Sequence, residues 1–162
     1  MNIRIVDENN FVLFIIDKKV IPSLEESILS DVLRKIFLKI KEKYNIEIYG
    51  NYNVTIYSDN YYGVIIKLEK EELEYLSYYE KQVEMKIIIS ENQVFYKLDD
   101  IFEIDKRILE KSNVYLYNNE LYLELNEEIN FILLGNLIEN SEITYENTNE
   151  IKIEGELIDL RW

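Results

Sequence analysis

Apolar positions open the chain in two short runs, which predict strands over residues 2–6 and 11–16. The second run is apolar at every position. A strand with two apolar faces belongs in the middle of a sheet, because both of its faces are then covered. We therefore expect the first half of the chain to be built on a sheet that has residues 11–16 inside it.

The clearest helix pattern follows this pair of strands. Ser23 and Glu26 have the spacing of a capping box, in which two side chains satisfy backbone N–H groups of the first helical turn. Apolar residues then recur every three or four positions up to residue 40, so one face of the expected helix is apolar. Its outward side is basic and favours a solvated surface over a binding patch. The basic side chains are Arg34, Lys35, Lys39, Lys41 and Lys43.

Alternating apolar and polar residues predict a half-buried strand over residues 46–56. A turn at Asp59 and Asn60 and a returning strand over 61–68 complete a hairpin. Residues 71–80 then have the pattern of a short helix, with Leu73 and Leu76 facing inward.

The second half begins with an alternating strand over residues 83–89 and a short strand over 94–96. Asp100 and Glu103 are placed to cap a second amphipathic helix that extends to residue 109. A second hairpin follows over 113–125, with its turn at Asn118 and Asn119. Residues 127–139 are apolar nearly all round and predict a deeply buried helix. In the tail, Ile151 and Ile153 have strand spacing.

Both halves show the same order of strands, amphipathic helix, hairpin and helix. We interpret this order as a weak internal repeat. The predicted fold class is α+β, with two similar small units, each a mostly antiparallel sheet packed against one or two helices. The expected units are residues 1–80 and an acidic C-terminal unit over 81–162.

Charge narrows the range of partners. The chain of 162 residues has 32 acidic and 18 basic side chains and a net charge of −14. Since nucleic-acid binding depends on basic side chains that neutralise phosphates, nucleic acid is not an expected partner. No apolar run has the length of a membrane span, and the N-terminus lacks the pattern of a secretion signal, so we expect a soluble, cytoplasmic protein without a membrane partner.

Two residue types that are common in catalytic sites are missing from the sequence. It has no histidine and no cysteine, which excludes thiol nucleophiles, Ser-His triads and zinc ligation by these residues. The four glycines are too far apart for a phosphate-binding loop. We therefore expect no enzyme activity, no metal and no cofactor. An enzyme that uses only carboxylates is the weakest alternative.

Three segments resemble the MecA adaptor proteins of low-GC Gram-positive bacteria. They are MNIRIVDENNFVLFI at residues 1–15, IEIYGNYNVTIYSDNYYGVIIKLEK at 46–70 and FYKLDDIFEIDKRILEKSNVYLYNNELYLELN at 95–126. The resemblance implies a non-catalytic adaptor that links client proteins to a ClpC-type AAA+ unfoldase and regulates Clp proteolysis. By analogy with the family, the second half would dock on the ATPase and the first half would present the client.

The resemblance directs attention to the second hairpin, where tyrosines and acids alternate with aliphatic residues. We expect the tyrosines and acids to face away from the core and to contact a partner protein, and cover by a second layer of helix is the alternative. These residues are Tyr115, Tyr117, Glu120, Tyr122 and Glu124. The corresponding client-facing surface of the first half would be the basic helix face of Arg34, Lys35, Lys39 and Lys41.

A structural or inhibitory acidic interaction protein is the alternative function. It would be a sporulation-associated assembly component or a phage-type DNA mimic that presents carboxylates to a DNA-binding protein. The binding of such a mimic would weaken steeply with salt, unlike tyrosine-rich contact with an ATPase.

Overall fold

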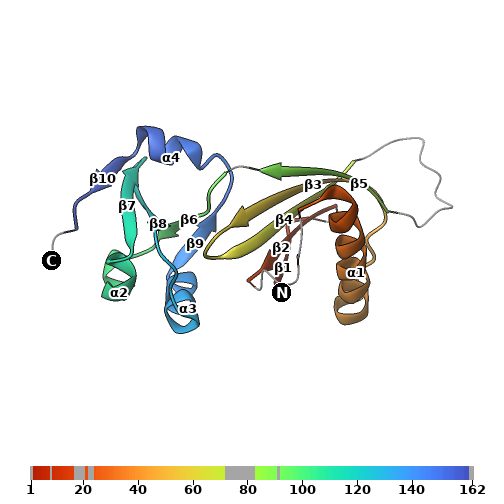
Figure 1. Cartoon of the computed structure of the whole chain (residues 1–162), viewed down its shortest axis with the longest axis horizontal. Coiled ribbons are helices and arrows are strands. Elements are labelled where there is room, and N and C mark those ends of the chain that lie inside the picture. The colour runs from red at the N-terminus through yellow and green to blue at the C-terminus, as the bar shows by residue number, and fades with distance from the viewer. Residues whose placement is uncertain are drawn as a thin grey trace. The chain divides into compact units, whose positions relative to one another are not determined.

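The computed structural model describes residues 2–7, 9–16, 21, 24–71, 83–90 and 92–160 (Figure 1). The chain divides into two compact units. Unit 1 comprises Met1–Ser58 and Gly63–Ser90, and unit 2 comprises Asp59–Tyr62 and Glu91–Trp162. Each contains a sheet with at least one helix packed on it, which confirms the predicted α+β class.

The described part of unit 1 contains a five-stranded sheet with the order β1-β2-β4-β3-β5. Strand β2 lies between β1 and β4 and is buried along nearly its whole length, as its apolar faces predict. The strands are β1 (Asn2–Ile5), β2 (Asn10–Ile15), β3 (Gly50–Asp59), β4 (Gly63–Lys70) and β5 (Val83–Ser90).

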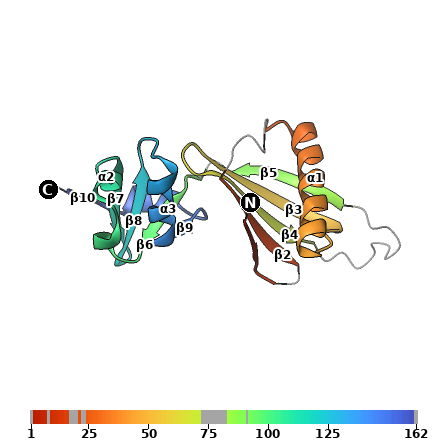
Figure 2. The same cartoon turned by 90° about the horizontal axis from the view of Figure 1, so that it is seen from below.

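Helix α1 (Glu26–Tyr44) lies across one face of this sheet (Figure 2). Its apolar stripe packs against alternate residues of β3, because successive side chains of a strand point to opposite faces. The stripe consists of Leu29, Leu33, Ile36, Phe37 and Ile40, and it meets Tyr52, Val54 and Ile56.

The start of α1 differs from the predicted capping box. The N-cap is Glu25, whose side chain makes no capping hydrogen bond, and Glu26 is the first helical residue. A capping box needs its glutamate at the third helical position, from which the side chain reaches back to the N-cap. Ser23 and the predicted helix at 71–80, beyond Glu71, lie outside the described residues.

Strand β5 pairs in parallel with β3, from Gly50 opposite Val83 to Tyr57 opposite Ser90. We expected residues 83–89 to open the second unit, with a boundary between residues 80 and 81. The pairing instead groups β5 with unit 1, which extends to Ser90.

The sheet described in unit 2 also has five strands, in the order β10-β7-β8-β6-β9, and all of its adjacent strands pair antiparallel. The predicted hairpin is confirmed. Its turn residues Asn118 and Asn119 both have positive φ, 50° and 62°, as a two-residue type I′ turn requires. The strands are β6 (Phe95–Leu98), β7 (Ser112–Tyr117), β8 (Glu120–Leu125), β9 (Ser141–Thr144) and β10 (Glu156–Ile158).

The prediction of one helix from residue 100 to residue 109 is wrong. Two short turns take its place, η2 (Ile101–Glu103) and α2 (Lys106–Leu109). Asp100 accepts a hydrogen bond from the Phe102 N–H and Asp105 accepts one from the Arg107 N–H, so each turn has its own cap. Ile104 between them is extended, which interrupts the helix.

Two further expectations for unit 2 are wrong. Helix α3 (Phe131–Glu139) begins at Phe131 rather than at residue 127, and the Asn130 side chain caps it by accepting the Leu133 N–H. The first residues of α3 are exposed, not deeply buried as predicted. Residues 151–153 form part of helix α4 (Asn149–Glu154), and the terminal strand is β10. Ile151 is buried and Ile153 is exposed. Residues two apart share a face in a strand but not in a helix, so this difference agrees with the helix. Strand β9 was not predicted.

Within unit 2, α4 lies on one side of the sheet and α2 and α3 lie on the other (Figure 1). Among the described helices of the chain, none is long and apolar enough to span a membrane.

Gly63 is expected to tolerate no side chain. Its φ is +129°, and an added Cβ would lie 2.3 Å from the Ile15 carbonyl oxygen. Gly63→Ala should therefore lower the free energy of unfolding by roughly 3 kcal/mol, from strain and steric overlap. The matched variant Gly135→Ala in α3 should raise it by about 1 kcal/mol, because no atom lies within 4 Å of its added Cβ and alanine favours helix. Urea titration followed by circular dichroism measures both, and equal effects would contradict the prediction.

Stability is expected to fall as the pH rises from about 10 towards 12. Burial, followed by the nearby Tyr49, raises the pKa of Tyr52 from 10.0 to about 12, and burial also raises the pKa of Tyr96. The unfolded state therefore loses these protons at lower pH than the folded state, and each pKa unit corresponds to about 1.4 kcal/mol. Tyr52→Phe should flatten the decline of the unfolding free energy between these pH values. An unchanged decline in this variant would contradict the prediction.

Candidate protein-binding surfaces

The tyrosines and acids of the β7–β8 hairpin share one face of the unit 2 sheet, but this face is not open. Tyr115 and Glu124 each expose only 8% of their surface, so for these two residues the alternative of a covering helix holds and neither is open to a partner. Tyr117, Glu120 and Tyr122 are partly buried. Helix α4 covers the face, because Ile151 packs against Phe95 and Tyr115.

Polar contacts hold α4 to this face. Lys152 Nζ lies 2.8 Å from Glu124 Oε1, and Tyr115 donates its hydroxyl to Glu124 Oε2 at 3.3 Å. The hydrogen bond to Glu124 raises the pKa of Lys152, and burial raises the pKa of Tyr115. Tyr117 donates to Glu150 Oε2 at 3.1 Å. The predicted tyrosine surface is therefore largely an internal contact between a helix and a sheet.

The ends of the same face stay more accessible. Glu120 forms an ion pair with Lys97 on β6, with Oε1 and Nζ 3.3 Å apart. The rings of Tyr117 and Tyr122 lie 6.2 Å apart in a tilted arrangement. Of the five predicted contact residues, Tyr117, Glu120 and Tyr122 keep some surface for a partner.

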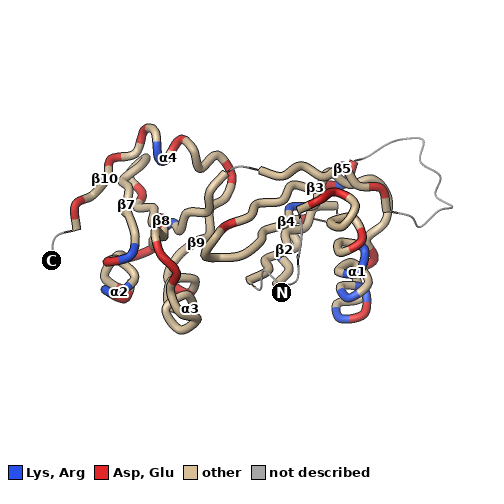
Figure 3. The backbone as a smooth tube through the Cα atoms, viewed as in Figure 1, with Lys and Arg blue, Asp and Glu red and all other residues tan. Residues whose placement is uncertain are grey.

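The basic residues predicted on α1 are exposed, as expected from their helical positions: Arg34, Lys35, Lys39 and Lys41. Figure 3 shows Lys and Arg positions in blue along α1. Arg34 and Lys41 also line a groove of about 380 Å³ within unit 1. The structure thus places two of the four at a concave surface.

This α1–β5 groove is built from three segments of the chain. Helix α1 contributes Arg34, Phe37, Leu38 and Lys41, the following loop contributes Glu47, Ile48 and Tyr49, and β5 contributes Val83 and Glu84. Its volume lies in the range of concave binding sites in proteins, and it combines apolar side chains with a few charged groups, as such sites do.

Apolar side chains differ in their accessibility within the groove. Phe37 and Ile48 are buried, whereas Leu38 exposes 62% of its surface and Tyr49 is also exposed. A partner side chain in the groove would therefore cover Leu38 and Tyr49 and rest on an apolar base. Such burial supplies most of the favourable free energy in protein association.

The rim of the groove carries both signs of charge. Lys41 Nζ lies 3.0 Å from Glu47 Oε1, and Lys70 Nζ lies 4.5 Å from the centre of the Tyr49 ring. Glu84 adds an exposed carboxylate on β5, and Arg34 adds a guanidinium on α1. Bidentate contact with a carboxylate is the strongest polar contact that Arg34 can offer a partner.

One signal for the groove was present in the sequence. Leu38 is an apolar residue on the otherwise basic side of α1, outside the stripe that packs on the sheet. The contribution of Val83 had no such signal, because it depends on the parallel pairing of β5 with β3.

Among the residues that the structure describes, no group of three or more acidic side chains is placed to hold a metal ion.

Comparison with known proteins places the chain in no family: no family model, no curated protein and no solved structure matches it.

The role of α4 as a cover can be tested with two isoleucines of the same helix. Ile151 is buried, so Ile151→Ala should cost about 2–4 kcal/mol of stability and loosen α4 from Tyr115. Ile153 is 81% exposed, so Ile153→Ala should change stability by less than about 0.5 kcal/mol. Hydrogen exchange of residues 149–158 should accelerate only in the first variant. Unchanged exchange there would show that α4 does not depend on this contact.

Proposed function

We propose that this protein is a non-catalytic, cytoplasmic adaptor that binds a peptide segment of a client protein in the α1–β5 groove. The observation that carries the proposal is the groove itself. It joins exposed Leu38 and Tyr49 to the guanidinium of Arg34 in one concavity of unit 1.

The shape and chemistry of the groove fit an extended segment with an aromatic or aliphatic side chain next to a carboxylate. The apolar side chain would cover Leu38 and Tyr49, and the carboxylate would pair with Arg34. Glu47 and Glu84 on the rim disfavour a run of several acids, so the preferred segment has one or two.

The second partner that we propose is a ClpC-type AAA+ unfoldase, as the resemblance of three segments to MecA adaptors implies. The chain's net charge of −14 supports protein partners over nucleic acid, since phosphates would be repelled. On the face of the β7–β8 hairpin that α4 partly covers, Tyr117, Glu120 and Tyr122 keep exposed surface and are the residues that we propose for this contact.

The groove is tested by selecting a displayed peptide library on the whole chain and measuring dissociation constants of enriched peptides by fluorescence anisotropy. Leu38→Glu and Arg34→Glu should each weaken binding about tenfold, equivalent to roughly 1.4 kcal/mol. Lys35→Glu and Lys39→Glu make the same charge change as Arg34→Glu on exposed positions of the same helix and serve as its matched controls. Equal loss in all four variants would indicate a general charge effect and contradict the groove.

The ATPase partner has a separate assay. The chain should bind purified ClpC and raise its ATPase rate, with little change between low and moderate salt. If the chain neither binds ClpC nor stimulates its ATPase activity, the ATPase assignment is contradicted, whereas the result for the groove is unaffected. Binding to a DNA-binding protein that weakens steeply with salt would instead support the alternative function of a DNA mimic.

A further inference from the structure

Helix α3 in unit 2 exposes two large apolar side chains side by side. Phe131 and Ile132 expose 82% and 83% of their surfaces, although the helix has a buried side available. Single exposed apolar residues are common, but two adjacent ones at the start of a helix form a patch with no cover in the described chain.

Gly135 belongs to the same side of the helix. It follows Phe131 by four positions and Ile132 by three, which places it between them on the helix surface. An added Cβ would meet no atom within 4 Å, so no contact inside the described chain requires glycine here. Glycine weakens a helix interior relative to alanine, and its benefit is that another backbone can approach closely. We name Phe131, Ile132 and Gly135 the α3 outer face.

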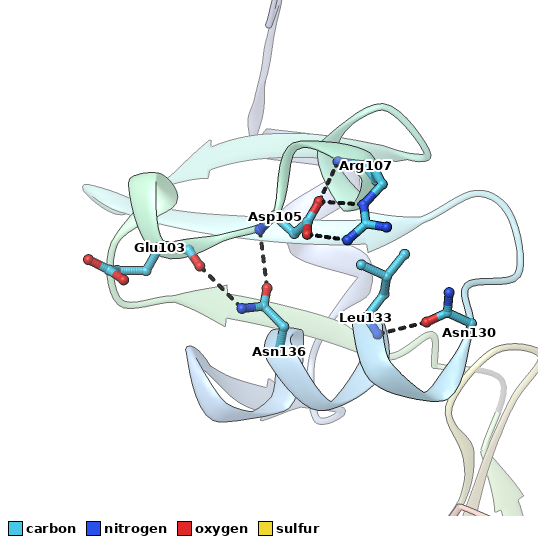
Figure 4. A network of polar contacts seen from close by, with 6 residues as sticks. All are labelled: Glu103, Asp105, Arg107, Asn130, Leu133 and Asn136. Carbon is cyan, nitrogen blue, oxygen red and sulfur yellow. Dashed lines mark hydrogen bonds and ion pairs between the residues drawn. The ribbon is translucent and has the colours of Figure 1, made fainter.

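The opposite side of α3 is anchored, which keeps the outer face turned away from the sheet. Leu133, Leu134 and Leu137 are buried. Asn136 accepts the Asp105 N–H at 3.1 Å and donates to the Glu103 carbonyl oxygen at 3.5 Å (Figure 4). The helix therefore presents its apolar patch on a fixed support rather than on a loose segment.

Acidic side chains stand at both ends of the α3 outer face. Glu127 and Glu128 precede the helix and Glu139 ends it, and all are exposed. Lys111 lies 3.8 Å from Glu127 and partly balances it. The nearby Arg107 is engaged by Asp105, with Nη2 and Oδ2 2.8 Å apart.

We propose that the α3 outer face is a docking surface for a basic amphipathic helix of another protein. Apolar side chains of that helix cover Phe131 and Ile132, its backbone crosses near Gly135, and its lysines or arginines lie against Glu128 and Glu139. A second copy of this chain fits less well, since each copy carries a net charge of −14 and the facing ends would both be acidic. The surface is in unit 2 and does not depend on the α1–β5 groove.

The probe is a synthetic amphipathic helix of leucine and lysine, titrated into the whole chain by calorimetry. Two control peptides replace its lysines with glutamate or its leucines with serine. The leucine–lysine peptide should bind at least tenfold more tightly than either control. The serine–lysine peptide keeps every positive charge, so equal binding by it would reduce the interaction to attraction by net charge and overturn the proposal.

Variants of the chain locate the site. Phe131→Ala combined with Ile132→Ala should weaken binding at least tenfold, whereas Ile153→Ala, an equally exposed residue of the same unit, should leave it unchanged. Both variants should keep the melting temperature of the parent, because the altered side chains are exposed. Equal binding in the two variants would overturn the proposal.

Gly135→Gln provides a test in which stability and binding change in opposite directions. Glutamine favours helix and the space around Gly135 is open, so the melting temperature should rise or stay constant while binding falls at least tenfold. Retained binding in this variant would exclude close approach at Gly135. Dimerisation of the parent chain that is lost in the Phe131 and Ile132 double variant would assign the face to a second copy and overturn the proposal.

Discussion

The apolar stripe of α1 packs against the inward-facing side chains of the unit 1 sheet, and this contact determines where the rest of the unit can lie. Leu33, Ile36 and Ile40 enter the same cluster as residues of β2, β3 and β4, with Met85 and Ile87 of β5 at its margin. An α-helix has 3.6 residues per turn, so burial of this stripe turns Arg34, Leu38 and Lys41 away from the core. These three side chains then line the groove. The positions of the α1 residues of the groove therefore follow from the packing of the core.

In unit 2 a comparable contact determines which residues are left for partners. Ile151 and Lys152 bring α4 onto the sheet, and the carboxylate of Glu124 receives both Lys152 and the Tyr115 hydroxyl. A carboxylate with little exposure needs such partners, because desolvation would otherwise penalise its charge. The same contact removes Tyr115 from the surface and leaves α3, on the other side of the sheet, as the more accessible apolar element.

Local patterns predicted the local parts of this fold. The Asn118–Asn119 turn and the strands beside it follow from residues that are neighbours in sequence, since asparagine tolerates the positive φ of the turn. Errors arose where the outcome depends on distant segments. The parallel pairing of β5 with β3 joins residues far apart in the chain, and the cover over Tyr115 comes from a helix whose alternating isoleucines resemble a strand. Apolar composition likewise could not show that α3 has too little partner surface to bury Phe131 and Ile132.

The parallel strand β5 also has a consequence for biosynthesis. Strand β3 has its full set of neighbours only when Val83–Ser90 has emerged from the ribosome, because Gly50 pairs with Val83 and Tyr57 with Ser90. Until then the β3 edge offers unpaired N–H and C=O groups to any extended polypeptide nearby. The interval between translation of β3 and translation of β5 is consequently the period in which unit 1 is most exposed to misassembly, and a chaperone that shields a strand edge would act there.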